Sequence, residues 1–108
     1  MVILSHADIP DRTEAIKSGD SEKLIHMLQE DARTLEKLGA ANIAITCNTS
    51  HYYYEQIQKA VSIPIIDMIH ESVAYAVREL PDVKRIGIMG TDGPSVPGSI
   101  TKNAESWA

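Results

Sequence analysis

The stretch NIAITCNTSH, residues 42–51, decides the fold of this 108-residue chain, because strand-forming residues give way there to a polar, helix-starting run. Residues 43–45 are apolar without alternation, as in a parallel strand that is buried on both faces. Thr49 or Ser50 is a good N-cap for the helix that follows. A strand followed at once by a helix is the first half of a βαβ crossover, and Cys47, the single cysteine of the chain, lies at the junction.

The rest of the chain repeats this alternation of apolar runs and helical stretches. Strands are predicted at residues 2–4, 42–46, 63–66 and 84–89, and helices at about residues 13–18, 21–38, 49–61 and 70–80. Strand–helix–strand units at this spacing predict parallel crossovers, with helices covering both faces of the sheet. The predicted fold is therefore α/β, a three-layer sandwich with a mainly parallel sheet.

The helix at residues 21–38 is the most clearly marked element. Five apolar residues follow one stripe at helical period: Leu24, Leu28, Ala32, Leu35 and Leu38. Asp20 or Ser21 is expected to cap its beginning, and Gly39 is a good terminator at its end.

Composition places the chain among ordinary soluble domains, with 44% hydrophobic and 23% charged residues. The net charge of −5 without a basic stripe argues against a nucleic-acid partner. No apolar run approaches the ~20 residues of a membrane helix, and the N-terminus lacks the basic region of a signal peptide. One cysteine cannot form an internal disulfide, which fits a reducing compartment. We therefore expect a cytoplasmic protein with no nucleic-acid and no membrane partner.

Cys47 is the first candidate for chemistry, because ligands of open α/β sheets bind beyond the carboxyl ends of the strands. A helix that starts directly after a thiol directs its positive end at the sulfur and lowers the pKa of the thiol. The amides of residues 49–51, with the side chains of Asn48 and Thr49, can hold a carboxylate or a phosphate. The alternative is a buried cysteine at the end of a strand, with Asn48 and Thr49 as a plain helix cap.

Arg12 follows the first apolar run and is expected at the same edge of the sheet. Its guanidinium can bind a carboxylate through two parallel hydrogen bonds. The alternative is a surface arginine paired with Asp8, Asp11 or Glu14. His6 shares this edge and can pair with Asp8 or simply order its own loop.

Other polar groups give weaker indications. His51, in the first turn after Cys47, is either an acid/base partner of the thiol or a partly exposed helix residue. His26 lies within a helix and is expected to have no specific role, His70 near a helix start is a candidate rim residue, and no metal-ligand spacing is present. The glycines of residues 87–93 fit neither a dinucleotide fingerprint nor a P-loop. Of the consecutive tyrosines 52–54, at most two can face any one site.

Four segments, taken in order, carry a resemblance: IPDRTEAI, IAITCNTSH, IPIIDMI and RIGIMGTDG. Together they resemble the aspartate/glutamate racemase family over roughly residues 2–93. Members of that family are amino-acid racemases that use no cofactor. The resemblance implies two pseudo-symmetric α/β halves, with a cysteine from each half flanking the α-carbon of an acidic amino acid.

The resemblance also implies roles for particular residues. Cys47 matches the cysteine of the first half, which exchanges the α-proton on one face of the substrate. Asn48 and Thr49 match residues that hold the α-carboxylate, and Arg12 matches an arginine that binds the side-chain carboxylate. Thr91 matches a threonine lining the cleft.

The chain departs from the family pattern at both ends. It starts at what corresponds to the second strand of the family, and the second cysteine, usually in a Gly-Cys-Thr-Glu motif, is absent. Residues 1–83 are thus interpreted as a partial first domain, and residues 84–108 as the start of the second domain followed by an irregular tail.

These departures predict a racemase fragment that is inactive alone. The alternatives are a non-catalytic domain that binds a carboxylate or self-associates through its unpaired sheet edge, and a cysteine hydrolase or transferase with His51 as the base.

Overall fold

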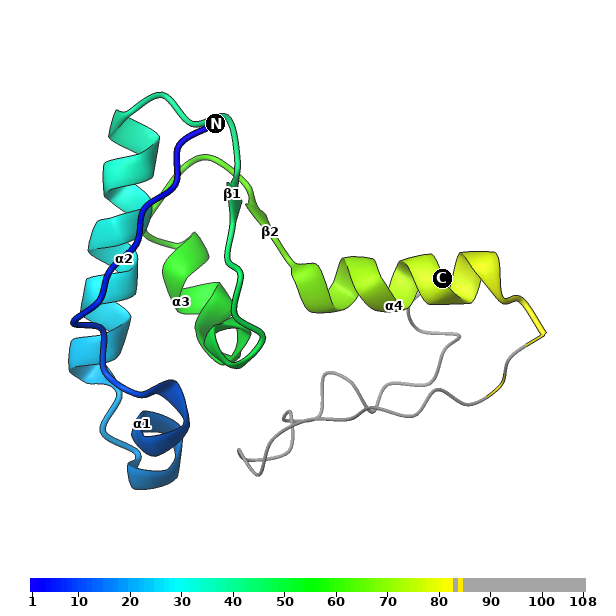
Figure 1. The fold of residues 1–108 in the computed structure, drawn as a ribbon, viewed down its shortest axis with the longest axis horizontal. Helices are drawn as coiled ribbons and strands as arrows, with labels where there is room; N and C mark the ends of the chain where they lie inside the picture. Colours follow the sequence, from blue (N-terminus) through cyan, green and yellow to red (C-terminus); the bar gives the residue numbers. More distant parts are fainter. Residues whose placement is uncertain (83, 85–108) are drawn as a thin grey trace.

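The structure is a computed structural model, and it describes residues 1–82 and 84. Its elements in chain order are α1 (Arg12–Ser18), α2 (Glu22–Lys37), β1 (Ile43–Ala44), the 3₁₀ helix η1 (Thr49–Tyr53), α3 (Tyr54–Gln58), β2 (Ile65–Ile66) and α4 (Met68–Glu79) (Figure 1). The two strands pair in parallel, with Ile43 opposite Ile65 and Ala44 opposite Ile66. The predicted α/β fold with parallel pairing is confirmed, in the form of a partial domain.

Helix α2 matches the helix predicted at residues 21–38. Its end is fixed by Gly39, whose φ of +85° favours glycine because it has no Cβ. The Gly39 N–H donates to the Glu36 carbonyl at 2.9 Å, and the Ala40 N–H donates to the Leu35 carbonyl at 3.1 Å. These two bonds are a Schellman motif, which satisfies carbonyls that the helix end would leave unpaired. Ser21 is the N-cap, but its side chain makes no capping hydrogen bond.

The core lies between α2, α3 and one face of the strands. One cluster joins the buried apolar residues Ala15, Leu24, Ala32, Ile43, Tyr53, Ile57 and Ile65. On the other face of the sheet, Ala44 and Ile66 are exposed in the described part of the chain. Leu38 was predicted on the buried stripe, but it is 60% exposed because it lies beyond the last turn of α2.

A second contact ties α2 to the segment that enters β2. The Glu36 carboxylate accepts hydrogen bonds from the Ser62 hydroxyl, from the Ser62 N–H at 2.8 Å and from the Ile63 N–H at 3.3 Å. Hydrogen bonds from the Ser62 side chain and then the Ser62 N–H are the largest effects and lower the pKa of Glu36. Desolvation raises it by less, and the Ile63 N–H lowers it by the smallest amount. This carboxylate therefore helps to place β2 beside α2.

Several predicted elements differ in the structure. Residues 2–4 form no strand and pair with neither β1 nor β2, and Val2 and Ile3 are exposed. Strands 42–46 and 63–66 shorten to two residues each, since each extends only as far as its partner. The helix predicted at residues 49–61 is a 3₁₀ turn followed by a short α-helix. The strand at residues 84–89 and the tail lie outside the described residues, apart from Lys84.

Helix α4 begins two residues before the predicted start at residue 70. Asp67 is its N-cap, and the Asp67 carboxylate accepts the His70 N–H at 3.0 Å. None of the residues of α4 is buried, and Figure 1 shows the helix extending away from α1, α2 and α3. In the described part of the chain, no helix combines the length and apolar character needed to cross a bilayer.

Candidate functional site

The site lies in the loop that leaves β1. Pairing ends at Ala44, and the 3₁₀ helix η1 begins at Thr49, so Cys47 falls at the carboxyl end of a parallel strand. This placement is the one that the sequence predicts. The N-cap of η1 is Asn48, rather than the expected Thr49 or Ser50.

Cys47 is half-buried, and the pKa of its thiol is lowered overall. Burial is the largest single effect and raises the pKa, because it disfavours the charged thiolate. Against it act hydrogen bonds from the Ser50 hydroxyl and the Ser50 N–H, then a hydrogen bond and the positive charge of the Arg12 guanidinium. Together these opposing contacts outweigh burial. Cys47 is therefore a more acidic thiol than an ordinary cysteine, as the sequence predicts.

The cause of this acidity differs in part from the expected helix dipole. The segment after the thiol is a five-residue 3₁₀ helix, too short for a substantial dipole. The pKa is lowered instead by particular hydrogen-bond donors, and those with the larger effect come from Ser50, a buried residue considered from the sequence only as a helix cap. Its position three residues after the thiol, in the first helical turn, is the available sequence signal, because a serine there turns its N–H and hydroxyl toward the strand end.

Arg12 is the first residue of α1 and is brought beside Cys47 from a distant part of the sequence. Asp11 caps that helix by accepting the Glu14 N–H at 2.8 Å, so its carboxylate is used locally. Arg12 itself donates to the Pro10 carbonyl at 3.4 Å. Within residues 1–82 and 84 it forms no ion pair, so the pairing considered with Asp8, Asp11 or Glu14 is not observed. The guanidinium remains a cation beside the thiol.

The two neighbours of Cys47 that were predicted to bind a carboxylate lie at the start of η1. Asn48 is exposed, and its side chain makes no capping hydrogen bond. Thr49 is half-buried. The amides predicted to be free are used in part, because the His51 N–H donates to the Asn48 carbonyl at 3.1 Å and the Ser50 N–H faces the thiol. Thr91 lies outside the described residues.

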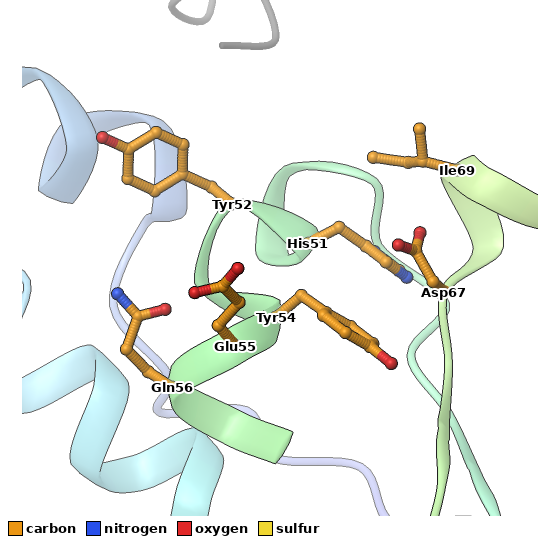
Figure 2. A pocket seen from close by; sticks show the side chains of 7 residues that line it. All are labelled: His51, Tyr52, Tyr54, Glu55, Gln56, Asp67 and Ile69. Carbon is orange, nitrogen blue, oxygen red and sulfur yellow. The ribbon is translucent and has the colours of Figure 1, made fainter. Parts of the chain in front are cut away.

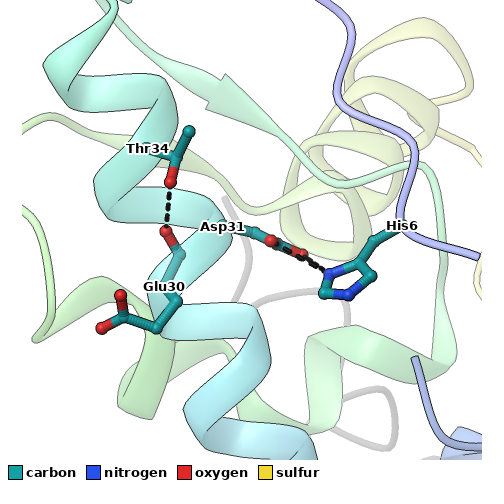
Figure 3. Close-up of polar contacts among 4 residues, drawn as sticks. All are labelled: His6, Glu30, Asp31 and Thr34. Atoms are coloured by element: carbon teal, nitrogen blue, oxygen red, sulfur yellow. Dashed lines mark hydrogen bonds and ion pairs between the residues drawn. The ribbon is translucent and has the colours of Figure 1, made fainter. Parts of the chain in front are cut away.

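His6 does not pair with Asp8. Its Nδ1 atom lies 2.9 Å and 3.1 Å from the two carboxylate oxygens of Asp31 on α2 (Figure 3). The same figure shows the neighbouring turn of α2, where the Thr34 hydroxyl donates to the Glu30 carbonyl at 2.9 Å. His6 thus holds the N-terminal segment against α2 and takes no part in the thiol site.

The tyrosine run divides between the core and the surface, as consecutive helical residues must. Tyr53 is buried and its hydroxyl is hydrogen-bonded to the Ser21 hydroxyl. Tyr54 donates its hydroxyl to the Ile65 carbonyl at 2.9 Å, while Tyr52 is largely exposed. These contacts fix η1 and α3 on the sheet, and with them the loop that carries Cys47.

A cavity of about 380 Å³ opens between η1, α3 and the start of α4 (Figure 2). Its lining residues are His51, Tyr52, Tyr54, Glu55, Gln56, Asp67 and Ile69. Neither Cys47 nor Arg12 lines it, and its link to the thiol site is His51, whose Nδ1 is bonded to the Cys47 carbonyl. In residues 1–82 and 84, no three histidine, cysteine, aspartate or glutamate side chains gather as metal ligands do.

The geometry therefore defines an α/β domain with an acidified thiol at the carboxyl end of a parallel strand. The family model described as Asp/Glu/Hydantoin racemase matches residues 1–105 of the chain. The chain belongs to this family of racemases, as the four sequence segments indicate.

Two curated relatives agree with this assignment. The broad specificity amino-acid racemase RacX of Bacillus subtilis (strain 168) is 34% identical over 82 residues, which are 75% of this chain and 34% of that protein. The glutamate racemase of Aquifex pyrophilus is 30% identical over 91 residues, covering 83% of this chain and 35% of that protein. The chain thus spans about a third of the length of these relatives.

Proposed function

We propose that the chain carries one half of a two-thiol racemase site for aspartate, glutamate or a close relative, with Cys47 as the acid/base for one face. The observation that carries the proposal is the lowered pKa of the Cys47 thiol, produced by Ser50 and Arg12 at the carboxyl end of β1. Membership in the racemase family supports it. No cofactor is invoked, and the single free thiol suits the reducing cytoplasm.

The chemistry follows from the residues in the loop. A thiolate at Cys47 takes the α-proton of the amino acid and becomes a thiol, and the carbanion takes a proton from a second acid on the opposite face. Asn48 and Thr49 hold the α-carboxylate, Arg12 binds the side-chain carboxylate, and Thr91 lines the cleft. The Arg12 guanidinium suits this role because it lies beside the thiol and forms no ion pair in the described part of the chain.

The single thiol of this chain supplies only one of the two protonic groups that racemisation needs. Inversion needs protonic groups on both faces of the α-carbon, and the 108 residues hold one cysteine. We therefore expect negligible racemase turnover from the 108-residue chain alone.

Chiral chromatography of L-aspartate and L-glutamate incubated with the chain tests this proposal. The expected result is unchanged optical purity. Sustained racemisation that disappears in Cys47→Ser would show that the chain supplies both protonic groups and would overturn the one-sided site. Deuterium uptake at the α-carbon in D₂O without inversion, absent from Cys47→Ser, would demonstrate the one-sided chemistry directly.

A second candidate function is a non-catalytic, carboxylate-binding domain that self-associates. Helix α4 favours it, because no residue of α4 is buried and two apolar side chains, Tyr75 on the helix and Leu80 at its C-cap, are more than half exposed. Apolar side chains left exposed on a helix favour association with a second chain. Sedimentation velocity of the chain and of Tyr75→Lys tests it: a concentration-dependent dimer weakened by the substitution is expected, and a monomer at high concentration would contradict it.

A further inference from the structure

His51 holds a position that neither sequence interpretation anticipated. It is 7% exposed, and both of its ring nitrogens contact backbone groups. The Met68 N–H donates to Nε2 at 3.3 Å. Because Nε2 accepts, the proton of the neutral imidazole is on Nδ1, which donates to the Cys47 carbonyl at 2.8 Å.

These two bonds join the loops that follow the two paired strands. Cys47 leaves β1, and Met68 is the first residue of α4, directly after β2. Figure 2 shows the His51 ring reaching from η1 toward Asp67 and the start of α4. The imidazole therefore spans the carboxyl edge of the sheet and holds the cysteine loop against the next helix.

His51 also fixes the loop through its own backbone. Its N–H donates to the Asn48 carbonyl at 3.1 Å, so His51 is hydrogen-bonded to the carbonyls of both Asn48 and Cys47. Ser50, whose hydroxyl and N–H bond to the Cys47 sulfur, lies in the turn that these two bonds close and is 3% exposed. The alignment of the Ser50 donors with the sulfur thus depends on where His51 holds the Cys47 carbonyl.

We propose that His51 is a positioning residue of the thiol site: as a neutral imidazole it aligns Cys47 with Ser50 through the Cys47 carbonyl. The role rests on the proposed function, in which Cys47 is the acid/base. It also excludes His51 as the base of a cysteine hydrolase, because both ring nitrogens are already engaged. Neither nitrogen is free to accept a proton from the thiol.

Two amide substitutions separate the two bonds of the ring. An asparagine at residue 51 places its side-chain N–H₂ near the position of Nδ1 and can donate to the Cys47 carbonyl, but it does not reach Met68. A glutamine places its amide near Nε2 and can accept from the Met68 N–H, but it leaves the Cys47 carbonyl without its donor. His51→Asn and His51→Gln are therefore a matched pair.

The readout is the rate of Cys47 alkylation by iodoacetamide as a function of pH, with circular dichroism to confirm folding. We expect His51→Asn to retain the wild-type profile. We expect His51→Gln to move the profile to higher pH and to slow alkylation about two- to threefold below the titration midpoint, as expected for loss of a hydrogen bond to the thiolate. Adding Ser50→Ala to His51→Gln should slow alkylation no further, because both changes remove the same contact.

Equal profiles for wild type, His51→Asn and His51→Gln would overturn the proposal, as would equal slowing in both variants. Additive effects of His51→Gln and Ser50→Ala would also overturn it. If His51→Gln does not fold, a shifted profile in His51→Asn still refutes the role. Alkylation requires no amino-acid turnover, so failure of the proposed racemase chemistry would leave this result unchanged and the two failures are distinguishable.

Discussion

Removing the Ser50 hydroxyl should make the Cys47 thiol measurably less acidic. The hydroxyl donates to the sulfur and, after burial, is the largest influence on this pKa and the largest that lowers it. A hydrogen bond to a charged group contributes ~1.5–3 kcal/mol. Because Cys47 is only half-buried, water replaces part of this contribution, and we take about 1 kcal/mol as the net loss in Ser50→Ala.

That loss translates into two observable changes. At ~1.4 kcal/mol for each factor of ten, the thiolate fraction below the titration midpoint falls about fivefold. The thiolate that remains is more basic and so a better nucleophile, with a Brønsted coefficient of about 0.4–0.5. The alkylation rate therefore falls less than the thiolate fraction, by about two- to threefold.

Ultraviolet absorbance of the thiolate during a pH titration measures the first change, and iodoacetamide kinetics measure the second. Ser62→Ala is the matched control, because Ser62 bonds to Glu36 and does not contact the thiol. Identical titrations for Ser50→Ala and Ser62→Ala would refute the assignment of Ser50 as a thiolate donor.

Two further predictions concern the fold. Leu24→Ala should lower the free energy of unfolding by ~2–5 kcal/mol, because Leu24 is 1% exposed, whereas Leu38→Ala should change it by less than about 0.5 kcal/mol. Urea denaturation compares the two variants, and equal losses would contradict the observed end of α2. Glu36→Gln should destabilise the chain at neutral pH, because it weakens the bonds to Ser62 and Ile63. The pKa of Glu36 is lowered in the folded chain, so this stabilisation is present above the ordinary glutamate pKa and is lost as the pH falls through the folded value. The difference in thermal midpoint between Glu36→Gln and wild type should therefore shrink in acid, and a constant difference would contradict the account.

Local signals in the sequence predicted the helices best. The stripe of Leu24, Leu28 and Ala32 and the terminator Gly39 lie within a few turns of one another, and the observed helix α2 follows them closely. The two strands at residues 42–46 and 63–66 were predicted in the right places but too long, because the length of a strand depends on a partner that is distant in sequence. Residues 2–4 were predicted as a strand for their apolar character, but they have no strand partner in the described part of the structure, which local sequence could not reveal.

The site was predicted in part for the same reason. The position of Cys47 follows from a strand that runs into a helical turn, which is a local pattern, whereas its lowered pKa depends on Ser50 in that turn and on Arg12, which is distant in sequence. The contacts of His6 with Asp31 and of His51 with Met68 join residues far apart in sequence, so periodicity could not reveal them. Ser50 was overlooked because a serine at a helix start usually caps the helix.

Protection of Cys47 by acidic amino acids tests the central claim most directly, that the thiol and Arg12 form one half of a racemase site. The rate of Cys47 alkylation is measured with increasing aspartate, glutamate or alanine, in the wild type and in Arg12→Gln, and each variant is compared with its own rate without ligand. We predict saturable slowing by aspartate or glutamate, little slowing by alanine, and loss of the difference in Arg12→Gln. Alkylation that is insensitive to all three amino acids, or that alanine slows as strongly as aspartate, would contradict the account.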